Sequence, residues 1–278
     1  MYLSRIQLTP ALLEQTQLGR LLRRDSYGMH QLLWDLFPDG QYLFREENSR
    51  EQQNTVQSWP LFYALSHKPP SENSPLFRVD SKPFQPKLHN GDRLSFHLRA
   101  NPTVAKRQEG KKNSARHDVV MDAKYQHLLQ HCFENGVVTE GDVYLEQHLG
   151  QQKQRRTLRN NLDRKQLQQK LLSLPAFKEH ARREAFMQEQ QQKADLAAVN
   201  WLEKKAEAGG FELEQTQATG YLWHSLSTVK QKRNAGYSSM DYQGVLRVTD
   251  TNTFVSQLNK GFGPAKRFGC GLMLIRPM

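Results

Sequence analysis

Two side chains near the N-terminus, Tyr27 and His30, have the types and the spacing that acid–base chemistry on a hydroxyl group requires. The sequence from Asp25 to Phe37 predicts a helix, on which a phenol and an imidazole three positions apart are neighbours. Histidine titrates near neutral pH, so it could take the 2'-OH proton of a ribose or return a proton to a leaving 5' oxygen. Spacing alone, however, favours a surface or interface pair over a catalytic pair.

The side chains of this predicted helix divide into an apolar face and a mixed face. His30 lies on the mixed face, so we expect it to lie away from the hydrophobic core. Asp25 or Ser26 is suited to cap the N-terminus of the helix. The apolar face is formed by Met29, Leu32, Leu33 and Leu36, and the mixed face by Tyr27, His30, Gln31 and Trp34.

A glycine-rich segment, residues 261–271, connects a predicted helix to a predicted closing strand near the C-terminus. Glycine permits backbone conformations that are barred to other residues, and successive N–H groups can form a concave anion site. Lys266 and Arg267 add positive charge to the segment. These features favour a loop that holds phosphate, whereas a tight structural turn is the alternative.

A second cationic cluster, formed by Lys230, Lys232 and Arg233, follows a predicted strand and precedes Asn-Ala-Gly. This order is typical of a hairpin tip. A lysine near a scissile phosphate could stabilise the negative charge that grows on the phosphoryl oxygens. The same cations could instead protect an exposed strand edge.

Positively charged side chains outnumber negatively charged ones, with 39 Lys and Arg against 28 Asp and Glu and a formal charge of +11. This excess favours nucleic acid as the partner. The sequence contains no amphipathic anchor, no lipidation signature, no long apolar run and no signal peptide, so we expect no membrane partner and a cytoplasmic location. Cys132 and Cys270 lie far apart, and no pair among the ten histidines falls at ligand spacing in a predicted helix or hairpin. We therefore expect no disulfide, no metal and no cofactor.

The predicted elements run strand, helix, strand, strand, helix, strand, and this order occurs twice. It predicts an α+β fold of two tandem ferredoxin-like (RRM-like) βαββαβ domains, with a helical insertion in the second. The first domain would span 1–88 and carry the helix with His30, and the second would span 89–278. The predicted strands are 2–8, 41–45, 55–65, 93–102, 211–213, 220–229, 242–249 and 272–275, and the predicted helices are 25–37, 195–208 and 251–259.

The insertion, at about 121–193, has a basic composition. Its segment 151–193 holds eleven Lys or Arg against four Asp or Glu, and many glutamines. Leucines at roughly helical intervals, namely Leu158, Leu162, Leu171 and Leu174, predict helices interrupted at Pro175. The positive charge could contact RNA, or it could simply be a solvated face.

In their order and context these residues resemble the repeat-RNA processing endoribonuclease of type I-E CRISPR systems, the CasE subunit of the Cascade complex. The shared landmarks run along the whole chain. They are Met1-Tyr-Leu-Ser, Tyr27-Gly-Met-His30 followed by Leu-Phe-Pro, Lys82-Pro-Phe-Gln-Pro, Leu98-Arg-Ala-Asn-Pro102, Trp201-Leu-Glu, Gly209-Gly-Phe and the glycine-rich segment to Leu272.

The resemblance implies a protein that binds the hairpin of CRISPR repeat RNA, cuts it at the stem base without a metal or cofactor, and stays with the other Cascade subunits. The expected products carry 2',3'-cyclic phosphate and 5'-hydroxyl ends. By position, His30 would be the general acid or base, Tyr27 would orient it or the 2'-OH, and Lys232, or Lys230 beside it, would stabilise charge. The RNA-binding residues implied are Lys230, Arg233, Gly263, Lys266, Arg267, Arg99, Lys106, Arg107, Arg23 and Arg24.

Two other functions stay open from the sequence. One is a structural RNA-binding subunit of a ribonucleoprotein complex that shares the fold but does not cleave. The other is a double-stranded DNA-binding protein, for which the sequence offers no helix-turn-helix and no zinc finger.

Overall fold

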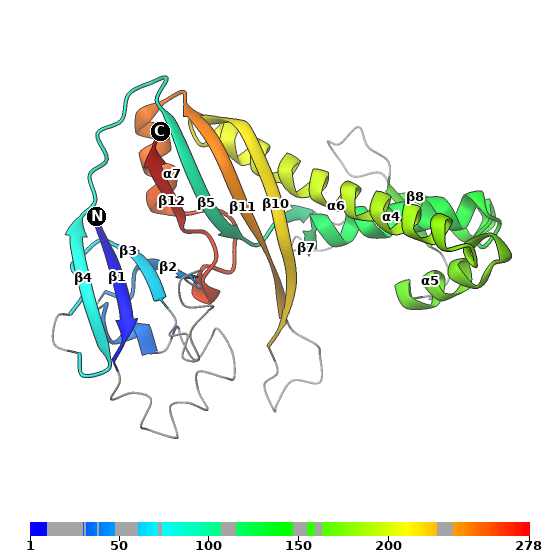
Figure 1. Cartoon of the computed structure of the whole chain (residues 1–278), viewed down its shortest axis with the longest axis horizontal. Helices are drawn as coiled ribbons and strands as arrows, with labels where there is room; N and C mark the ends of the chain where they lie inside the picture. Colours follow the sequence, from blue (N-terminus) through cyan, green and yellow to red (C-terminus); the bar gives the residue numbers. More distant parts are fainter. Residues whose placement is uncertain are drawn as a thin grey trace. The chain divides into compact units, whose positions relative to one another are not determined.

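The computed structural model of the chain (Figure 1) describes residues 1–9, 30, 32–37, 39–47, 61–71, 74–106, 115–146, 155–158, 163–226 and 236–278. They form two compact units. Unit 1 contains residues 1–101 and 203–278, and unit 2 contains residues 102–202.

The first sheet of unit 1 has four antiparallel strands: β1 (Tyr2–Leu8), β2 (Tyr42–Glu47), β3 (Leu61–Ser66) and β4 (Phe77–Pro83). Their order across the sheet is β2-β3-β1-β4. Side chains of β1 alternate, so that Ser4, Ile6 and Leu8 are buried. Ile6 packs in one core cluster with Leu33 and Phe37 of the segment that joins β1 to β2. The alternation in the sequence thus sets which face of β1 meets the core.

The second sheet of unit 1 repeats this order. It contains β5 (Arg93–Ala100), β10 (Phe211–Ser225), β11 (Gly236–Val248) and β12 (Met273–Pro277), arranged β10-β11-β5-β12 (Figure 1). The predicted strand 93–102 is β5, with its even-numbered side chains from Leu94 to Ala100 buried. Helix α7 (Thr251–Lys260) follows β11, and the Asp250 side chain caps it by accepting from the Thr253 N–H.

The predicted α+β class with two ferredoxin-like halves is confirmed, and both sheets have the strand order of that fold. Three details differ from the prediction. The described residues between β3 and β4, 67–71 and 74–76, contain no helix. β4 was not among the predicted strands, and the two short strands predicted at 211–213 and 220–229 are the single strand β10. The predicted domain boundary at residue 88 falls between β4 and β5 and stays a prediction.

A small apolar cluster connects the two sheets of unit 1. Leu43 of β2 and Leu65 of β3 pack with Leu272, which directly precedes β12. Gly261, at the end of α7, has φ +74°, and a Cβ there would lie 2.7 Å from a methyl carbon of Leu43. Only glycine therefore fits where the glycine-rich segment begins.

Unit 2 is built mainly from helices. The helices are α4 (Val119–Glu134), α5 (Arg164–Ser173) and α6 (His180–Ala208), which leaves unit 2 after Leu202. The paired strands are β6 (Thr103–Lys106) with β7 (Ala115–Asp118), and β8 (Val143–Glu146) with β9 (Arg155–Leu158). Short 3-10 turns occur at Glu140–Asp142 and Pro175–Phe177.

The helical character predicted for 151–193 is confirmed in α5 and α6, with the predicted break at Pro175 between them. It is wrong at Leu158, which ends β9. The predicted helix 195–208 begins much earlier, at His180, and ends as predicted before Gly209-Gly210. Among the described helices, none is long and apolar enough to span a bilayer.

Candidate functional site

His30 lies packed among aromatic rings and is only 7% exposed. Its ring meets the ring of Trp34 edge-on, with centroids 5.6 Å apart, and lies parallel to the ring of Phe44 on β2, at 6.1 Å. The prediction that His30 lies away from the core is therefore wrong. Tyr42 and Phe44 of β2 pack against His30, whereas Trp34, on the same mixed face, is 49% exposed.

Tyr42, the first residue of β2, is a hydrogen-bond partner of His30. Its hydroxyl oxygen lies 2.7 Å from His30 Nδ1 and 3.0 Å from the His30 carbonyl oxygen. One hydroxyl has one proton, so both contacts are satisfied if Tyr42 donates to the carbonyl and accepts from Nδ1–H. This tautomer, assigned from the hydrogen-bond network, places the basic lone pair of His30 on Nε2.

The surroundings of His30 keep its imidazole neutral near pH 7. Burial lowers its pKa from the usual 6.5, and the positive charge of Arg267 lowers it further. Burial also raises the pKa of the Tyr42 hydroxyl, so this group stays protonated. His30 is thus suited to accept a proton, and Arg267 is the cation whose charge lowers its pKa.

The predicted phosphate-binding loop, residues 261–271, is a rigid turn that brings Arg267 toward this site. Gly263, Gly269 and Gly271 all have positive φ, and so does Ala265. Arg267 lies on a short 3-10 turn, Lys266–Phe268, and its side chain is exposed. The Phe262 N–H donates to the Gly271 carbonyl, and the Gly271 N–H donates to the Arg99 carbonyl. The loop is therefore tied to β5 at its base.

Two of the predicted RNA-binding cations have partners within the protein. The Lys266 ammonium group donates to the Lys260 carbonyl at the C-terminus of α7, where a cation also meets the negative end of the helix dipole. Arg99 binds both carboxylate oxygens of Asp241, at 2.9 Å each. Burial disfavours the charged form of Arg99, but its hydrogen bonds and ion pair with Asp241 raise its pKa above the usual value.

A small cavity of about 70 Å³ lies between the two sheets of unit 1. Three stacked rings line it: His224 of β10 lies 4.5 Å from its cross-strand neighbour Tyr237 of β11, and Tyr237 lies 4.6 Å from Phe268. The Phe44 ring also lines the cavity, so the cavity adjoins the His30 site. Its remaining lining residues are Glu46, Arg99, Ser239 and Gly269.

His224 is a second titratable group at this cavity. Its Nε2 lies 2.8 Å from the Ser239 hydroxyl. Burial lowers the pKa of His224, and the charge of Arg99 lowers it further. Stacked aromatic rings bordered by cations are typical of sites that hold a nucleotide base and its phosphate.

The structure thus brings Arg267 of the glycine-rich loop near enough to His30 for its charge to lower the pKa of His30. Several other predicted site residues lie outside the described residues, and for Lys106 only the backbone, at the end of β6, is described. The predicted cluster with Lys230 and Lys232 falls in the connection between the paired strands β10 and β11. The predicted site residues that lie outside the described residues are Tyr27, Lys230, Lys232, Arg233, Arg107, Arg23 and Arg24.

Tyr42 and His224 were missed from the sequence. Tyr42 belongs to the predicted strand 41–45, but its pairing with His30 depends on how the strand packs against the helix. His224 lies in the run Tyr221-Leu-Trp-His224, whose aromatic character is a signal of stacking. Another missed pair is His127 and His131, four residues apart on α4, a helix that was not predicted.

Two ferredoxin-like sheets in tandem form the framework of this site, with His30 on the helical segment that precedes β2 and a glycine-rich cationic loop that precedes β12. Residues 1–277 match the family described as CRISPR associated protein, and the chain belongs to this family. The resemblance that the sequence indicated is confirmed at the level of family and fold. No curated protein matches the chain in sequence.

The chain is similar to solved structures over its whole length. The CRISPR endoribonuclease Cse3 bound to a 19-nucleotide RNA matches over 100% of both chains, with 21% identity and a TM-score of 0.58. Cas6e from Escherichia coli str. K-12 also matches over 100% of both chains, with 21% identity and a TM-score of 0.52. A chain of a CRISPR RNA-guided surveillance complex, in a pre-nicking state, matches over 100% of both chains, with 17% identity and a TM-score of 0.52.

Proposed function

We propose that this protein is a metal-independent endoribonuclease that binds the hairpin of CRISPR repeat RNA and cuts precursor CRISPR RNA at the base of the stem. Membership of the CRISPR associated family and the fold shared with RNA-bound Cse3 support this substrate class. The observation that carries the proposal is the state of His30: Tyr42 holds its Nδ1, its Nε2 is the basic nitrogen, and Arg267 lies near it.

In the proposed reaction, His30 Nε2 accepts the proton of a ribose 2'-OH. The 2' oxygen attacks the adjacent phosphorus, the bond from phosphorus to the 5' oxygen breaks, and the 5' oxygen leaves and takes up a proton. The products are a 2',3'-cyclic phosphate and a 5'-hydroxyl. Because the attacking oxygen is already beside the phosphorus, the protein has to align it, move protons and stabilise the charge on the phosphoryl oxygens.

Arg267 is the described cation best placed to stabilise the charge on the phosphoryl oxygens, because it lies near enough to His30 for its charge to lower the pKa of His30. Lys232, or Lys230 beside it, remains the proposed second cation, and Tyr27 remains the proposed orienting group. The stacked rings of His224, Tyr237 and Phe268 would hold a base next to the cut. The remaining RNA contacts proposed are those of Gly263, Arg233, Lys106, Arg107, Arg23 and Arg24.

Lys266 and Arg99 would act on the RNA mainly through their charge, because each already donates to a protein group. After cleavage the protein would keep the mature RNA and join other Cascade subunits. The fold shared with a chain of a surveillance complex supports this partner class. We expect this activity in the cytoplasm.

A non-catalytic RNA-binding subunit is the second candidate function. The observation that favours it is the burial of His30, which together with the Tyr42 hydrogen bonds is what a purely structural histidine would have. The two candidates share the RNA hairpin and the Cascade partners, and they differ only in whether a phosphodiester bond is cut.

Cleavage of a labelled repeat hairpin in EDTA separates the two candidates. The same RNA with a 2'-deoxy nucleotide before the expected cut is run beside it, with His30→Gln as the test variant and His67→Gln, which changes an exposed histidine, as its control. We expect cleavage of the all-ribose RNA only, by wild type and His67→Gln but not by His30→Gln. Tight binding by His30→Gln would show that the chemistry was lost and not the fold. Equal cleavage by His30→Gln and wild type would exclude His30 as the catalytic group.

A further inference from the structure

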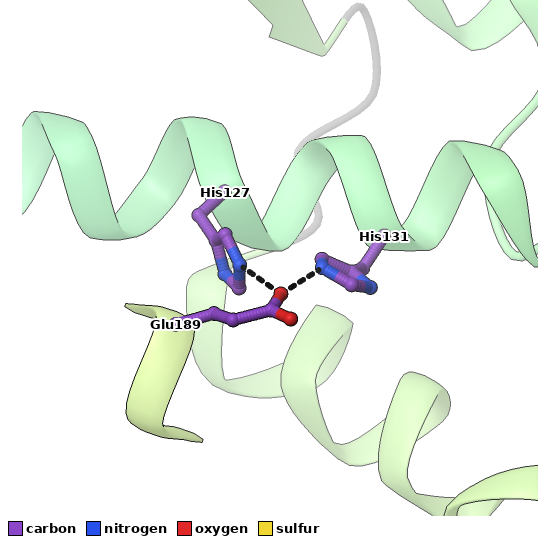
Figure 2. A group of neighbouring side chains, drawn as sticks. All are labelled: His127, His131 and Glu189. Carbon is purple, nitrogen blue, oxygen red and sulfur yellow. Dashed lines mark hydrogen bonds and ion pairs between the residues drawn. The ribbon is translucent and has the colours of Figure 1, made fainter. Parts of the chain in front are cut away.

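Two imidazoles and a carboxylate converge between α4 and α6 of unit 2 (Figure 2). His127 and His131 lie one turn apart on α4, and Glu189 comes from the facing helix α6. Glu189 Oε2 lies 3.5 Å from Nε2 of each histidine. One ligand atom from each of the three residues lies within 4.8 Å of the others.

This spacing is close to what one metal ion requires. Around a four-coordinate zinc with bonds of about 2.0–2.1 Å, neighbouring ligand atoms lie roughly 3.3–3.4 Å apart. The distances from Glu189 Oε2 to Nε2 of His127 and of His131, 3.5 Å each, are close to this spacing without any movement. The two imidazole nitrogens lie within 4.8 Å of each other.

Within the part of the chain that the structure describes, the buried His127 ring has few polar contacts. His127 is 6% exposed, and its Nε2 has only the long contact with Glu189. Its Nδ1 is buried with no hydrogen-bond partner among the described residues. Burial lowers the pKa of His127, and the neighbouring His131 lowers it further, whereas Glu189 raises it.

Neighbouring groups fix the positions of the three candidate ligands. The Phe186 ring lies 5.1 Å from the ring centroids of both His127 and His131. Gln190, next to Glu189, is buried and donates to the Lys124 carbonyl, which ties α6 to α4 at this level.

His131 also has a carboxylate behind it. Its Nδ1 lies 4.0 Å from Glu134 Oε2, and the other oxygen of Glu134 accepts from the Gln130 amide. A carboxylate behind a metal-binding imidazole is the usual arrangement in metal sites, because it fixes the ring orientation and makes the ligand more basic.

We propose that His127, His131 and Glu189 bind a divalent transition metal of the zinc class, which joins α4 to α6 in unit 2. Two imidazoles and one carboxylate favour such an ion over Mg²⁺ or Ca²⁺, which prefer oxygen ligands. Glu189 is 55% exposed, so the fourth position faces solvent and would take a water molecule. The role is structural. A ligand that binds only the folded state stabilises it by mass action, and the ion would hold together two helices that are far apart in sequence.

The test uses the whole chain, freed of metal and titrated with Zn²⁺ alone, with thermal unfolding and calorimetry as readouts. We expect one Zn²⁺ per chain and a melting temperature that rises with Zn²⁺ but not with Mg²⁺. Titration with Co²⁺ should give the visible absorption bands of a four-coordinate ion. Since changes behind the ligands alone weaken metal binding by about 10–100-fold, Glu189→Gln, which removes a ligand, should weaken it by at least about 100-fold.

Glu184→Gln is the matched control. Glu184 lies on the same helix, 3.4 Å from His180, and forms an exposed pair that lacks a third ligand. We expect this variant to bind Zn²⁺ like wild type. Glu189 is partly exposed and glutamine has its shape, so Glu189→Gln should fold, which its own melting curve without metal verifies. No Zn²⁺ binding by wild type, or equal binding by wild type and Glu189→Gln, would overturn the proposal.

Discussion

Arg99 on β5 holds both carboxylate oxygens of Asp241 on β11, with Nε–Oδ1 and Nη2–Oδ2 distances of 2.9 Å. The same carboxylate lies 3.8 Å from Nη2 of Arg45, which belongs to β2 in the first sheet. Arg45 is only 5% exposed. One aspartate thus lies against two arginines from different sheets, beside the cavity that adjoins His30, and Arg45 also pairs with Glu47 at 2.6 Å.

Asp241→Asn is predicted to destabilise unit 1, because it leaves Arg45 and Arg99 with less compensating charge. Losing one partner of a buried ion pair costs about 3–5 kcal/mol, and Asp241 is partly exposed, so we expect the free energy of unfolding to fall by roughly 2 kcal/mol. Urea unfolding of wild type and variant measures this change in the free energy of unfolding. The control Asp80→Asn removes the partner of Arg5 in a pair that is about half exposed, and should cost less than about 1 kcal/mol. Equal losses in both variants would contradict a shared role for Asp241.

Tyr42→Phe is predicted to slow RNA cleavage while leaving the sheet intact. The ring would still stack on Phe37, whose centroid lies 4.3 Å away, but the hydroxyl that holds His30 Nδ1 and its carbonyl would be gone. We expect a stability loss of about 1 kcal/mol and a single-turnover rate lower by about tenfold, because the His30 tautomer is no longer fixed. Tyr63→Phe, on the neighbouring strand β3, is the control for loss of a hydroxyl. An unchanged cleavage rate in Tyr42→Phe would exclude Tyr42 as a positioning residue.

Arg267→Gln is predicted to shift the pH dependence of cleavage toward higher pH. The Arg267 charge lowers the pKa of His30, so its removal lets that pKa rise toward the usual 6.5. If His30 is the base, the cleavage rate falls as pH drops through the pKa of His30. This acidic limb of the pH–rate profile would lie at higher pH in the variant than in wild type. Single-turnover rates at saturating RNA between pH 5 and 8 measure the shift. Arg276→Gln removes an exposed charge elsewhere on the second sheet and should leave the limb in place.

Trp223→Ala is predicted to weaken RNA binding more than it weakens the fold. The Trp223 ring is 52% exposed on β10 and covers Gly236 across the hairpin, where a Cβ would lie 2.4 Å from the ring. An exposed flat ring can stack on a base, and such contacts are worth about 1–3 kcal/mol, or roughly 5–150-fold in affinity. Binding titrations with a non-cleavable hairpin measure this loss of affinity. Leu196→Ala removes a similarly exposed apolar side chain in unit 2, and an equal effect of both variants would contradict stacking.

How far the sequence predicts this fold depends on whether the signal is local. The alternation in β5 and the Asp250 cap of α7 are local, and both elements were predicted from these patterns. β4 (Phe77–Pro83) was missed because most of its side chains are at least partly exposed at the edge of the sheet, so its burial pattern hardly alternates. The α4 helix was missed although Asp118 caps it, because its many polar residues obscure a narrow buried face.

For the candidate site, residue types were predictable but partners were not. His30 and Arg267 lie at opposite ends of the chain, and their approach depends on the packing of the two sheets. The Tyr42 hydroxyl meets His30 only because β2 packs against this histidine, which was expected to lie away from the core. The same holds in unit 2, where Glu189 completes a group with His127 and His131 only after α6 packs on α4.

The pH dependence of stability should reflect three histidines: His30 and His127, which are buried, and His224, which is half-buried. Burial is the main cause of a lowered pKa in each of them. Below pH 6.5 the unfolded chain therefore binds more protons than the folded chain, so stability is greatest above pH 6.5 and falls as pH drops toward the folded-state values. Each histidine contributes a slope of at most about 1.4 kcal/mol per pH unit. Carboxylates with lowered pKa, such as Asp250, act only below the usual value of 3.8.

Urea unfolding at pH 7.5, 6.5 and 5.5 in EDTA tests this prediction in a range where the histidines dominate. His224→Gln should reduce the fall in stability between pH 6.5 and 5.5, because the variant has one group fewer to protonate on unfolding. His89→Gln, at a histidine whose side chain is 84% exposed, is the control for replacing an imidazole as such. A free energy of unfolding that stays constant from pH 7.5 to 5.5 would mean that burial does not hold these imidazoles neutral, and would remove the basis for assigning His30 as the base.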